Sequence, residues 1–420
     1  MASTKAKGVC RNSFAPDIQP DVNFSASGGR GSGTLGCATV APPLVSGWLP
    51  SECDSFRALY IHVPFCKRRC LYCDFATEAV DPLSPAIGRY VEDMVLSIRR
   101  ASREGLLGHV ETVYLGGGTP TFVGQKALAE ILYTLSLSLF LTDQVECTIE
   151  ANPDSLTLPL VRDLWALGAN RISVGVQSFD DAELALLGRV HDADAACRAV
   201  ELAHDRFSNV SVDLMCGIPG QTLATFERSL RTAIDLGVSH VSVYPLTIEE
   251  GTPFDRMVDA GELSDVDADF QADCMELASE VLSDAGMERY EVASYAKPGF
   301  ACRHNKAYWT GVSYLGLGPS AVSMAQSAHE RVRVQDGEVV ERLDAAQMLA
   351  EDLMLGMRMT CGIGPDLLES ARIVFPEFEA AVQVLVDKAL ARWEGVRFVS
   401  TKQGWLCGNE LYGTLLDLAP

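Results

Sequence analysis

Six short apolar segments alternate with amphipathic helical patterns between residues 58 and 244, and this alternation limits the possible folds more than any other feature. The segments are 58–63, 112–115, 145–149, 171–176, 210–214 and 240–244. Nearly continuous apolar runs are typical of parallel strands that are covered on both faces, and the helices between them supply the crossover connections. The pattern predicts an α/β fold with an incomplete six-unit (β/α) barrel of the TIM type; a doubly wound sheet is the alternative.

Polar and glycine-rich residues follow these segments at their carboxyl ends, where (β/α) barrels gather functional groups. They are GGGTP at 116–120, Glu150 with Asn152, Gln177 with Ser178, and Asp213 followed by GIPG at 217–220. Glycines let a ligand approach the backbone and its N–H donors, and carboxylates accept hydrogen bonds from ammonium or ribose hydroxyl groups. Each feature alone is also typical of a turn or a helix cap. Their recurrence predicts a ligand site at this end of the barrel.

Three cysteines, Cys66, Cys70 and Cys73, follow the first predicted strand at the spacing C-x3-C-x2-C. The three basic residues between the first two favour the thiolate, which is the form that binds metal. A structural zinc site normally has four protein ligands, whereas three thiolates suit a [4Fe-4S] cluster with one open iron. The alternatives are cysteines that bind no metal and a zinc site completed by His62 or Cys53.

This cysteine loop resembles that of the radical S-adenosylmethionine (SAM) superfamily. In that superfamily SAM chelates the open iron, and the reduced cluster cleaves SAM to a 5′-deoxyadenosyl radical. From about residue 59 onward, the chain resembles the coproporphyrinogen-dehydrogenase-like family of this superfamily. The matching segments are YIHVPFC at 60–66, GGGTPT at 116–121, IEANP at 149–153, VQSF at 176–179 and DLMCGIPG at 213–220.

The resemblance implies a set of cofactor-binding positions. Cys66, Cys70 and Cys73 match the ligands of the [4Fe-4S] cluster. The implied SAM contacts are Tyr60, Tyr72, Gly117, Gly118, Thr119, Glu150, Gln177, Arg189, Asp213 and Val322. Arg189 is expected to hold the carboxylate of the methionine moiety as a fork, and its alternative role is a surface ion pair. No catalytic side chain is assigned.

Two branches of this family differ at two short motifs that can be compared with this sequence. The oxygen-independent coproporphyrinogen III dehydrogenases usually have a further cysteine two residues after the third, where this chain has Phe75. The heme chaperones of the HemW type have an H-N-x-x-Y-W element, which CRHNKAYW at 302–309 resembles. That resemblance implies heme contacts at His304, Tyr308 and Trp309. The alternative is that His304 orders a loop by hydrogen bonds and Trp309 packs in the core.

The sequence therefore predicts a heme chaperone that binds heme, a [4Fe-4S] cluster and SAM. Its expected partners are an unidentified heme-acceptor protein, with a membrane-associated acceptor as one option, and a reductant for the cluster. The first alternative is a coproporphyrinogen III dehydrogenase, which decarboxylates its substrate oxidatively to protoporphyrinogen IX in heme biosynthesis. The second alternative is a non-catalytic scaffold with a structural cluster.

Charge and cysteine content limit the partners and the compartment. The 420 residues include 34 Lys and Arg against 56 Asp and Glu, a net charge of −22 that disfavours nucleic acid and anionic lipid. The 13 cysteines are an odd number in a large chain, which indicates a reducing compartment rather than a disulfide scaffold. No apolar run approaches the ~20 residues of a membrane helix, so we expect a cytoplasmic protein.

The composition also predicts four regions along the chain. Residues 1–52 are Gly/Ser-rich and lack a periodic apolar face, so we expect a disordered arm; an organelle transit peptide is the alternative. Residues 53–300 form the predicted radical SAM barrel, and 301–340 hold the heme motif and a hairpin around Asp336-Gly337. Residues 341–420 read as a small helical, winged-helix-like domain with a second hairpin formed by 397–400 and 404–406.

Overall fold

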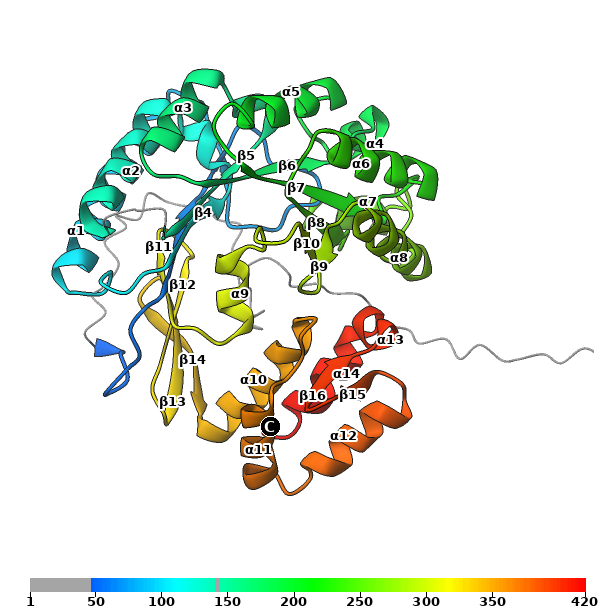
Figure 1. Ribbon diagram of the computed structural model, residues 1–420. Coiled ribbons are helices and arrows are strands. Elements are labelled where there is room, and N and C mark those ends of the chain that lie inside the picture. The colour runs from blue at the N-terminus through cyan, green and yellow to red at the C-terminus, as the bar shows by residue number, and fades with distance from the viewer. Residues whose placement is uncertain (1–46, 140–143) are drawn as a thin grey trace, which may run out of the picture.

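A computed structural model describes residues 47–139 and 144–420 of the chain (Figure 1). The predicted N-terminal arm therefore lies outside the described residues up to residue 46. From Gly47 onward the chain is in contact with the folded body, because Trp48 and Leu49 pack against its hydrophobic core.

Seven neighbouring parallel strands form the curved centre of one large sheet, in the order β11-β1-β4-β5-β6-β7-β8. Their bounds are β1 (Ala58–Val63), β4 (Thr112–Gly117), β5 (Glu146–Ala151), β6 (Arg171–Gln177), β7 (Asn209–Cys216), β8 (His240–Pro245) and β11 (Tyr314–Leu317). The six predicted strands are β1 and β4 to β8, and they lie side by side in chain order. This order confirms the open barrel, because a doubly wound sheet would reverse its order at a switch point. Strand β11 was not among the predicted strands.

Antiparallel strands extend both edges of the sheet. They are β12 (Val322–Gln326), β13 (Glu330–Gln335) and β14 (Glu338–Asp344) beyond β11, and β10 (Ser294–Ala296) and β9 (Glu288–Arg289) beyond β8. The β13–β14 pair is the predicted first hairpin, and Asp336 (φ 48°) and Gly337 (φ 85°) form its turn. Residues 314–344 thus continue the barrel sheet.

Helices cover the outer face of the parallel strands (Figure 1). They are α1 (Pro85–Arg103), α2 (Gln125–Leu139), α3 (Leu158–Ala166), α4 (Asp181–Leu186), α5 (Ala193–Ala203), α6 (Leu223–Asp235), α7 (Pro253–Asp259) and α8 (Ala268–Asp284), with short 3₁₀ turns η2 (Pro120–Val123) and η3 (Pro153–Ser155). Gly168 (φ 101°) and Gly237 (φ 80°) follow the ends of α3 and α6, where left-handed backbone stops a helix.

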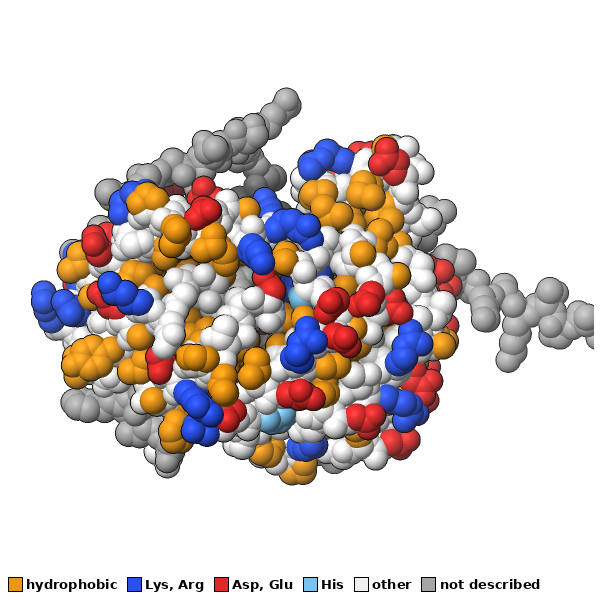
Figure 2. Space-filling model, turned by 90° about the horizontal axis from the view of Figure 1, so that it is seen from above, with side chains coloured by type: hydrophobic (Ala, Val, Ile, Leu, Met, Phe, Trp, Pro, Cys, Tyr) orange, Lys and Arg blue, Asp and Glu red, His pale blue; other side chains and the backbone are white. Residues whose placement is uncertain are grey.

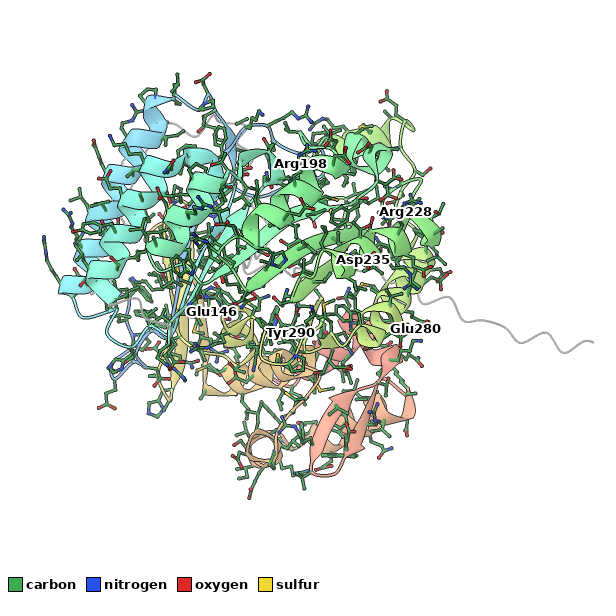
Figure 3. The ribbon with its side chains drawn as sticks, turned by 45° about the horizontal axis from the view of Figure 1, so that its top comes forward. Glu146, Arg198, Arg228, Asp235, Glu280 and Tyr290 are labelled. Carbon is green, nitrogen blue, oxygen red and sulfur yellow. The ribbon has the colours of Figure 1, made fainter. Side chains whose placement is uncertain are left out.

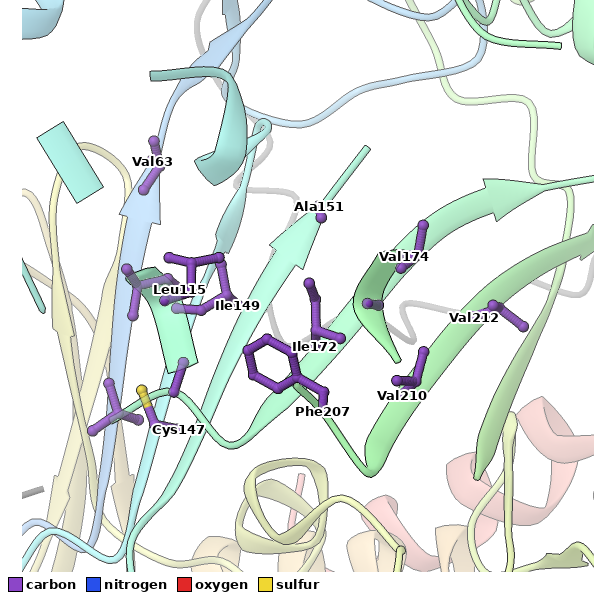
Figure 4. Close-up of a cluster of buried hydrophobic side chains, with 14 of the residues drawn as sticks. Val63, Leu115, Cys147, Ile149, Ala151, Ile172, Val174, Phe207, Val210 and Val212 are labelled. Atoms are coloured by element: carbon purple, nitrogen blue, oxygen red, sulfur yellow. The ribbon is translucent and has the colours of Figure 1, made fainter. Parts of the chain in front are cut away.

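Alternate residues of the strands separate an apolar layer from a polar interior. Leu59, Ile61 and Val63 of β1 belong to the main core beneath the helices, whereas Tyr60 and His62 lie on the other face of the strand. Figure 4 shows part of this core on β1 and β4 to β7, with Phe207. Each fully buried aliphatic side chain stabilises the fold by about 1.5–3 kcal/mol. The helices thereby hold the barrel without using its inner face.

The C-terminal part of the chain packs below the barrel in the view of Figure 1. It contains α10 (Ala345–Arg358), α11 (Pro365–Val374), α12 (Phe378–Asp387), β15 (Ala391–Glu394), β16 (Arg397–Ser400), α13 (Lys402–Leu406) and α14 (Gly408–Leu416), and α9 (Arg303–Trp309) lies between it and the barrel. The predicted second hairpin was wrong in its second strand. Residues 397–400 pair instead with β15 across Gly395, and Thr401 caps α13 by accepting a hydrogen bond from Gly404 N–H at 3.0 Å.

Buried ion pairs join the extended sheet to this C-terminal part. Arg331 and Arg333 on β13 both pair with Glu351 on α10, and Arg331 also pairs with Asp352 at 2.8 Å. The two arginine side chains are only 1% and 6% exposed, so solvent hardly screens these charges. Removal of the shared carboxylate would leave Asp352 as the carboxylate partner of Arg331 and Glu341 as that of Arg333.

We predict that Glu351→Ala lowers the free energy of unfolding of the cluster-free protein by about 3–5 kcal/mol, because it breaks a buried pair from one side. The matched control is Glu330→Ala on the same sheet, where the pair with Arg342 is more exposed and about 1 kcal/mol or less is expected. Chemical denaturation of both variants measures the difference, and equal losses would contradict the assigned role.

Candidate functional site

A cavity with about 1310 Å³ of empty space opens at the carboxyl ends of the parallel strands. Figure 2 shows the molecule from above the view of Figure 1, and basic and acidic side chains lie close together near the middle of that face. The cysteine loop after β1 forms one wall, and the ends of β4 to β8 form the rest.

Eleven of the sequence-predicted residues line this one cavity. They are Cys66, Cys70, Tyr72, Cys73, Gly117, Gly118, Thr119, Glu150, Gln177, Arg189 and Asp213. Tyr60 and Val322 are not among the lining residues. Tyr60 is buried against Tyr114, and its hydroxyl is 3.0 Å from His62 Nδ1, while Val322 packs beside Tyr308.

The cavity also has lining residues that were not predicted from the sequence. They include Ser173, Gly175, Met215, Tyr244, Thr247 and Glu249, whereas Asn152, which was named with Glu150 at a strand end, also lines the cavity. Tyr244 ends the sixth predicted strand, so the rule that found the other positions would have reached it. The loop after β8 carries no glycine run or matching motif, and Thr247 and Glu249 therefore gave no signal.

The glycine run after β4 packs against the cysteine loop. Gly118 N–H donates to Val63 O at 2.8 Å, and Thr119 N–H donates to Phe65 O at 2.8 Å. A Cβ on Gly118 would lie 2.7 Å from Phe65 O, closer than side chains tolerate. We expected these N–H groups to face a ligand. They are instead used within the protein, where they fix the segment that leads into Cys66.

The basic residues of the loop also bind protein groups. Arg69 donates to Cys73 O at 3.1 Å, Arg68 donates to Arg189 O at 2.7 Å, and Lys67 pairs with Asp154. We expected these cations to lower the thiol pKa values. Burial outweighs them, since it raises the pKa of Cys66 and raises the pKa of Cys73 to about 11.

The geometry disfavours a zinc site completed by His62. His62 is buried, with Nε2 3.0 Å from Ala76 O and Nδ1 3.0 Å from the Tyr60 hydroxyl, so both ring nitrogens have partners. Across residues 47–139 and 144–420, no group of three or more His, Cys, Asp or Glu side chains is arranged to hold a metal ion. Cys66, Cys70 and Cys73 line the same cavity.

Arg189 reaches the cysteine loop from the segment after α4. Its Nη1 donates to Cys70 Sγ at 3.2 Å, and its Nη2 donates to Asn152 Oδ1 and Gly175 O, both at 2.7 Å. Within the part of the chain that the structure describes, the buried Nε has no hydrogen-bond partner. Arg189 therefore contacts a predicted cluster ligand, and its unused donor fits an anionic group at this site.

Two carboxylates complete the inner side of the cavity. Glu150 accepts a hydrogen bond from the Tyr114 hydroxyl at 2.7 Å, and Asp213 accepts one from Ser173 Oγ at 3.2 Å. Burial raises the pKa of Asp213 above its usual range. Gln177 stands in left-handed backbone (φ 68°) after a bulge in β6, which turns this strand end toward the cavity.

The proposed heme motif lies at the opposite end of the strands. His304 on α9 is fully buried, with Nδ1 2.8 Å from Thr112 Oγ1 and Nε2 3.2 Å from the Tyr308 hydroxyl. Thr112 begins β4, whereas the cavity lies beyond the end of that strand. In this conformation His304 orders its surroundings, as the alternative interpretation states.

Its neighbours are packed in the same region. Glu146, which begins β5, accepts a hydrogen bond from the backbone N–H of His304 at 3.0 Å. In Figure 3 Glu146 lies on the side of the barrel that faces the C-terminal part of the chain, whereas Arg198 and Arg228 lie on outer helices. Tyr308 packs edge-on against Tyr314, and Trp309 is half-buried under the Arg358 guanidinium, 5.0 Å from the ring centroid.

Comparison with known proteins identifies the family of this chain. Residues 60–233 match the family model described as the radical SAM superfamily. A Mycobacterium tuberculosis protein named Heme chaperone HemW is 36% identical over 396 residues, which cover 90% of this chain and 98% of that protein. A Synechocystis protein of the same name is 36% identical over 73% of this chain and 79% of that protein.

The chain belongs to the HemW family of radical SAM proteins. Another HemW relative, from Bacillus subtilis, is 30% identical over 86% of this chain and 99% of its own length. A solved structure titled as coproporphyrinogen III oxidase (HemN) from Escherichia coli has a TM-score of 0.71 at 19% identity, covering 87% of this chain and 90% of that chain. At this identity the likeness concerns the fold alone. Among the described helices of this HemW-family chain, none is long and apolar enough to cross a membrane.

We predict that Gly118→Ala reduces the iron bound per chain after anaerobic reconstitution by at least about half. The new Cβ would collide with backbone at Phe65 and Val63 and displace the segment before Cys66. Gly88→Ala on α1 is the matched control, because its Cβ would meet nothing within 4 Å. Iron and sulfide analysis measures both variants, and full loading of Gly118→Ala would contradict the role of this contact.

A second prediction concerns the pH dependence of stability. Burial lowers the pKa of His304 to about 3, whereas the unfolded chain titrates near about 6.5. The unfolded state therefore takes up this proton first as the pH falls. His304 costs stability below about pH 6.5, with a slope of up to about 1.4 kcal/mol per pH unit.

Chemical denaturation between pH 7 and pH 4.5 tests this expectation. His304→Gln should lose less stability on acidification than the wild type, while the same change at exposed His329 should leave the slope unaltered. Parallel slopes for all three proteins would mean that His304 is not held neutral by burial.

Proposed function

We propose that this protein is a heme chaperone that holds a [4Fe-4S] cluster and SAM in the barrel cavity and binds heme for delivery to an acceptor protein. The observation that carries the proposal is the convergence of three cysteines and eight matched SAM positions on one cavity. The names of the HemW relatives support the heme part of the proposal.

The lining residues fit the two cofactors chemically. Cys66, Cys70 and Cys73 would hold three irons of the cluster, and the fourth iron would stay open. Glu150, Gln177 and Asp213 offer oxygen acceptors for the ammonium group and ribose hydroxyls of SAM. When bound and reduced, the cluster can supply the electron that cleaves SAM.

The position two residues after Cys73 favours a chaperone over a dehydrogenase. Phe75 stands where the dehydrogenase branch usually has a further cysteine, and the Phe75 side chain lines the cavity. The Phe75 carbonyl accepts hydrogen bonds from Thr77 N–H and from Arg69. The backbone of Phe75 thus stabilises the cysteine loop, and its side chain offers no thiol to the cavity.

We further propose that His304, Tyr308 and Trp309 shape the heme site through α9. Because the ring nitrogens of His304 are paired with Thr112 and Tyr308, an iron–His304 bond is not part of the proposal for this conformation. Heme held at this end of the strands would be remote from the SAM cavity. Such a separation suits carrying heme better than modifying its side chains.

The proposal includes the protein's surroundings. An acceptor protein takes the heme, and an external one-electron reductant charges the cluster. Free thiols at the cluster loop suit a reducing compartment, so we place the protein in the cytoplasm. The net charge of −22 argues against nucleic acid as a partner.

The test uses full-length protein reconstituted and reduced without oxygen. One sample receives heme, followed by apomyoglobin as a generic acceptor, and a second receives SAM with coproporphyrinogen III. We expect a heme difference spectrum, transfer of heme to the acceptor, and no decarboxylated porphyrin. Formation of vinyl product, or absence of heme binding, would overturn the proposal.

A cluster-free variant separates the remaining alternative. Cys70→Ala should lose the cluster and reduce heme transfer, while the control Cys361→Ala, at an exposed cysteine outside the cavity, should behave as the wild type. Unchanged heme transfer by a folded Cys70→Ala would support a cluster with a structural role only.

A further inference from the structure

Arg189 and Thr119 each donate a hydrogen bond to a predicted cluster ligand, and the Asn152 side chain connects these two donors. Its Oδ1 accepts from Arg189 Nη2 at 2.7 Å, and its Nδ2 donates to Thr119 Oγ1 at 2.9 Å. Arg189 donates through Nη1 to Cys70 Sγ at 3.2 Å, and the Thr119 hydroxyl donates to Cys66 Sγ at 3.7 Å. One amide therefore connects the groups that contact two of the three sulfurs.

The direction of every bond in this chain is determined by Arg189. A guanidinium has donors only, so the oxygen of the Asn152 amide must face it. The NH₂ group of the amide then faces Thr119, and Thr119 Oγ1 must act as its acceptor. Since a hydroxyl has a single proton, that proton is left to point at Cys66 Sγ.

The residues of the bridge are partly shielded from solvent. Asn152, Arg189 and Cys70 are half-buried, and all three line the main cavity together with Thr119. Thr119 is only 4% exposed. Hydrogen bonds in such a site are strengthened by the low local dielectric, and connected donors polarise one another.

We propose that Asn152 is a positioning residue that sets the reduction potential of the cluster by aiming Thr119 at Cys66 and Arg189 at Cys70. Hydrogen bonds to ligand sulfurs stabilise the more negative, reduced state and therefore raise the potential. The proposal rests on the cluster of the proposed function, and it adds a residue that none of the SAM or cluster positions includes.

Asn152→Asp tests the direction of the chain with almost no change of shape. A carboxylate keeps the bond from Arg189 but accepts the Thr119 proton, so Thr119 turns away from Cys66. We expect normal iron content, a midpoint potential more negative than that of the wild type in an EPR-monitored redox titration, and a changed EPR signal of the reduced cluster.

The added negative charge would also lower the potential, and a double-mutant cycle with Thr119→Val removes that ambiguity. The charge acts in both backgrounds, whereas the redirected proton exists only when Thr119 is present. The shift caused by Asn152→Asp should therefore be smaller in the Thr119→Val background. Asn209→Asp, which adds the same charge at the start of β7 and can still accept from Ser239, should leave the potential unchanged.

The outcomes separate this inference from the proposed function. If the wild type binds no four-iron cluster, the proposed function fails. If the wild type loads iron but the two shifts are strictly additive, or Thr119→Val leaves the potential unaltered, the role of Asn152 fails alone. Should Asn152→Asp not load iron, the cycle is run with Asn152→Ala, where the same non-additivity is expected.

Discussion

Two backbone hydrogen bonds between the end of β4 and the segment after β1 hold the cysteine loop in position. They run from Gly118 N–H to Val63 O and from Thr119 N–H to Phe65 O, and they form because a residue without a side chain lets the two segments approach. The same contact brings the Thr119 hydroxyl to Cys66. This close packing therefore determines the position of Cys66 Sγ and of the Thr119 hydroxyl beside it.

The barrel keeps its two ends chemically distinct. The carboxyl ends of the strands hold the thiols, the carboxylates and the open cavity, whereas α9 fills the other end with a paired, buried histidine. The ion pairs of Arg331 and Arg333 with α10 hold the C-terminal part at that second end. A heme site at that end would therefore be separated from the residues of the SAM cavity.

The sequence predicted the elements that depend on local pattern. The six parallel strands were recognisable in the sequence as mainly apolar runs. Parallel strands of this kind are largely buried, because helices cover the outer face of the sheet and the inner face is enclosed by the barrel. The β13–β14 hairpin was visible because Asp-Gly adopts positive φ readily. The cluster and SAM positions were found through motif resemblance and through their place at strand ends, and eleven of them line one cavity.

Other features depend on contacts between distant segments, and no local pattern reveals them. The parallel strand β11 is only four residues long and pairs with β1, more than two hundred and fifty positions away. The second strand expected at 404–406 is a helix, because the Thr401 cap decides the outcome. Asn152 accepts a hydrogen bond from Arg189, and Arg189 donates another to the Cys70 thiol. Both contacts exist only because β5, β6 and the cysteine loop meet in the folded protein.

The most direct measurement of the central claim is EPR and iron analysis of the anaerobically reconstituted, reduced protein, before and after addition of SAM. The account predicts about four irons per chain, held by the three loop cysteines, and a spectrum that changes when SAM binds the open iron. A single bound metal ion per chain, or a four-iron spectrum that SAM leaves unaltered, would contradict it.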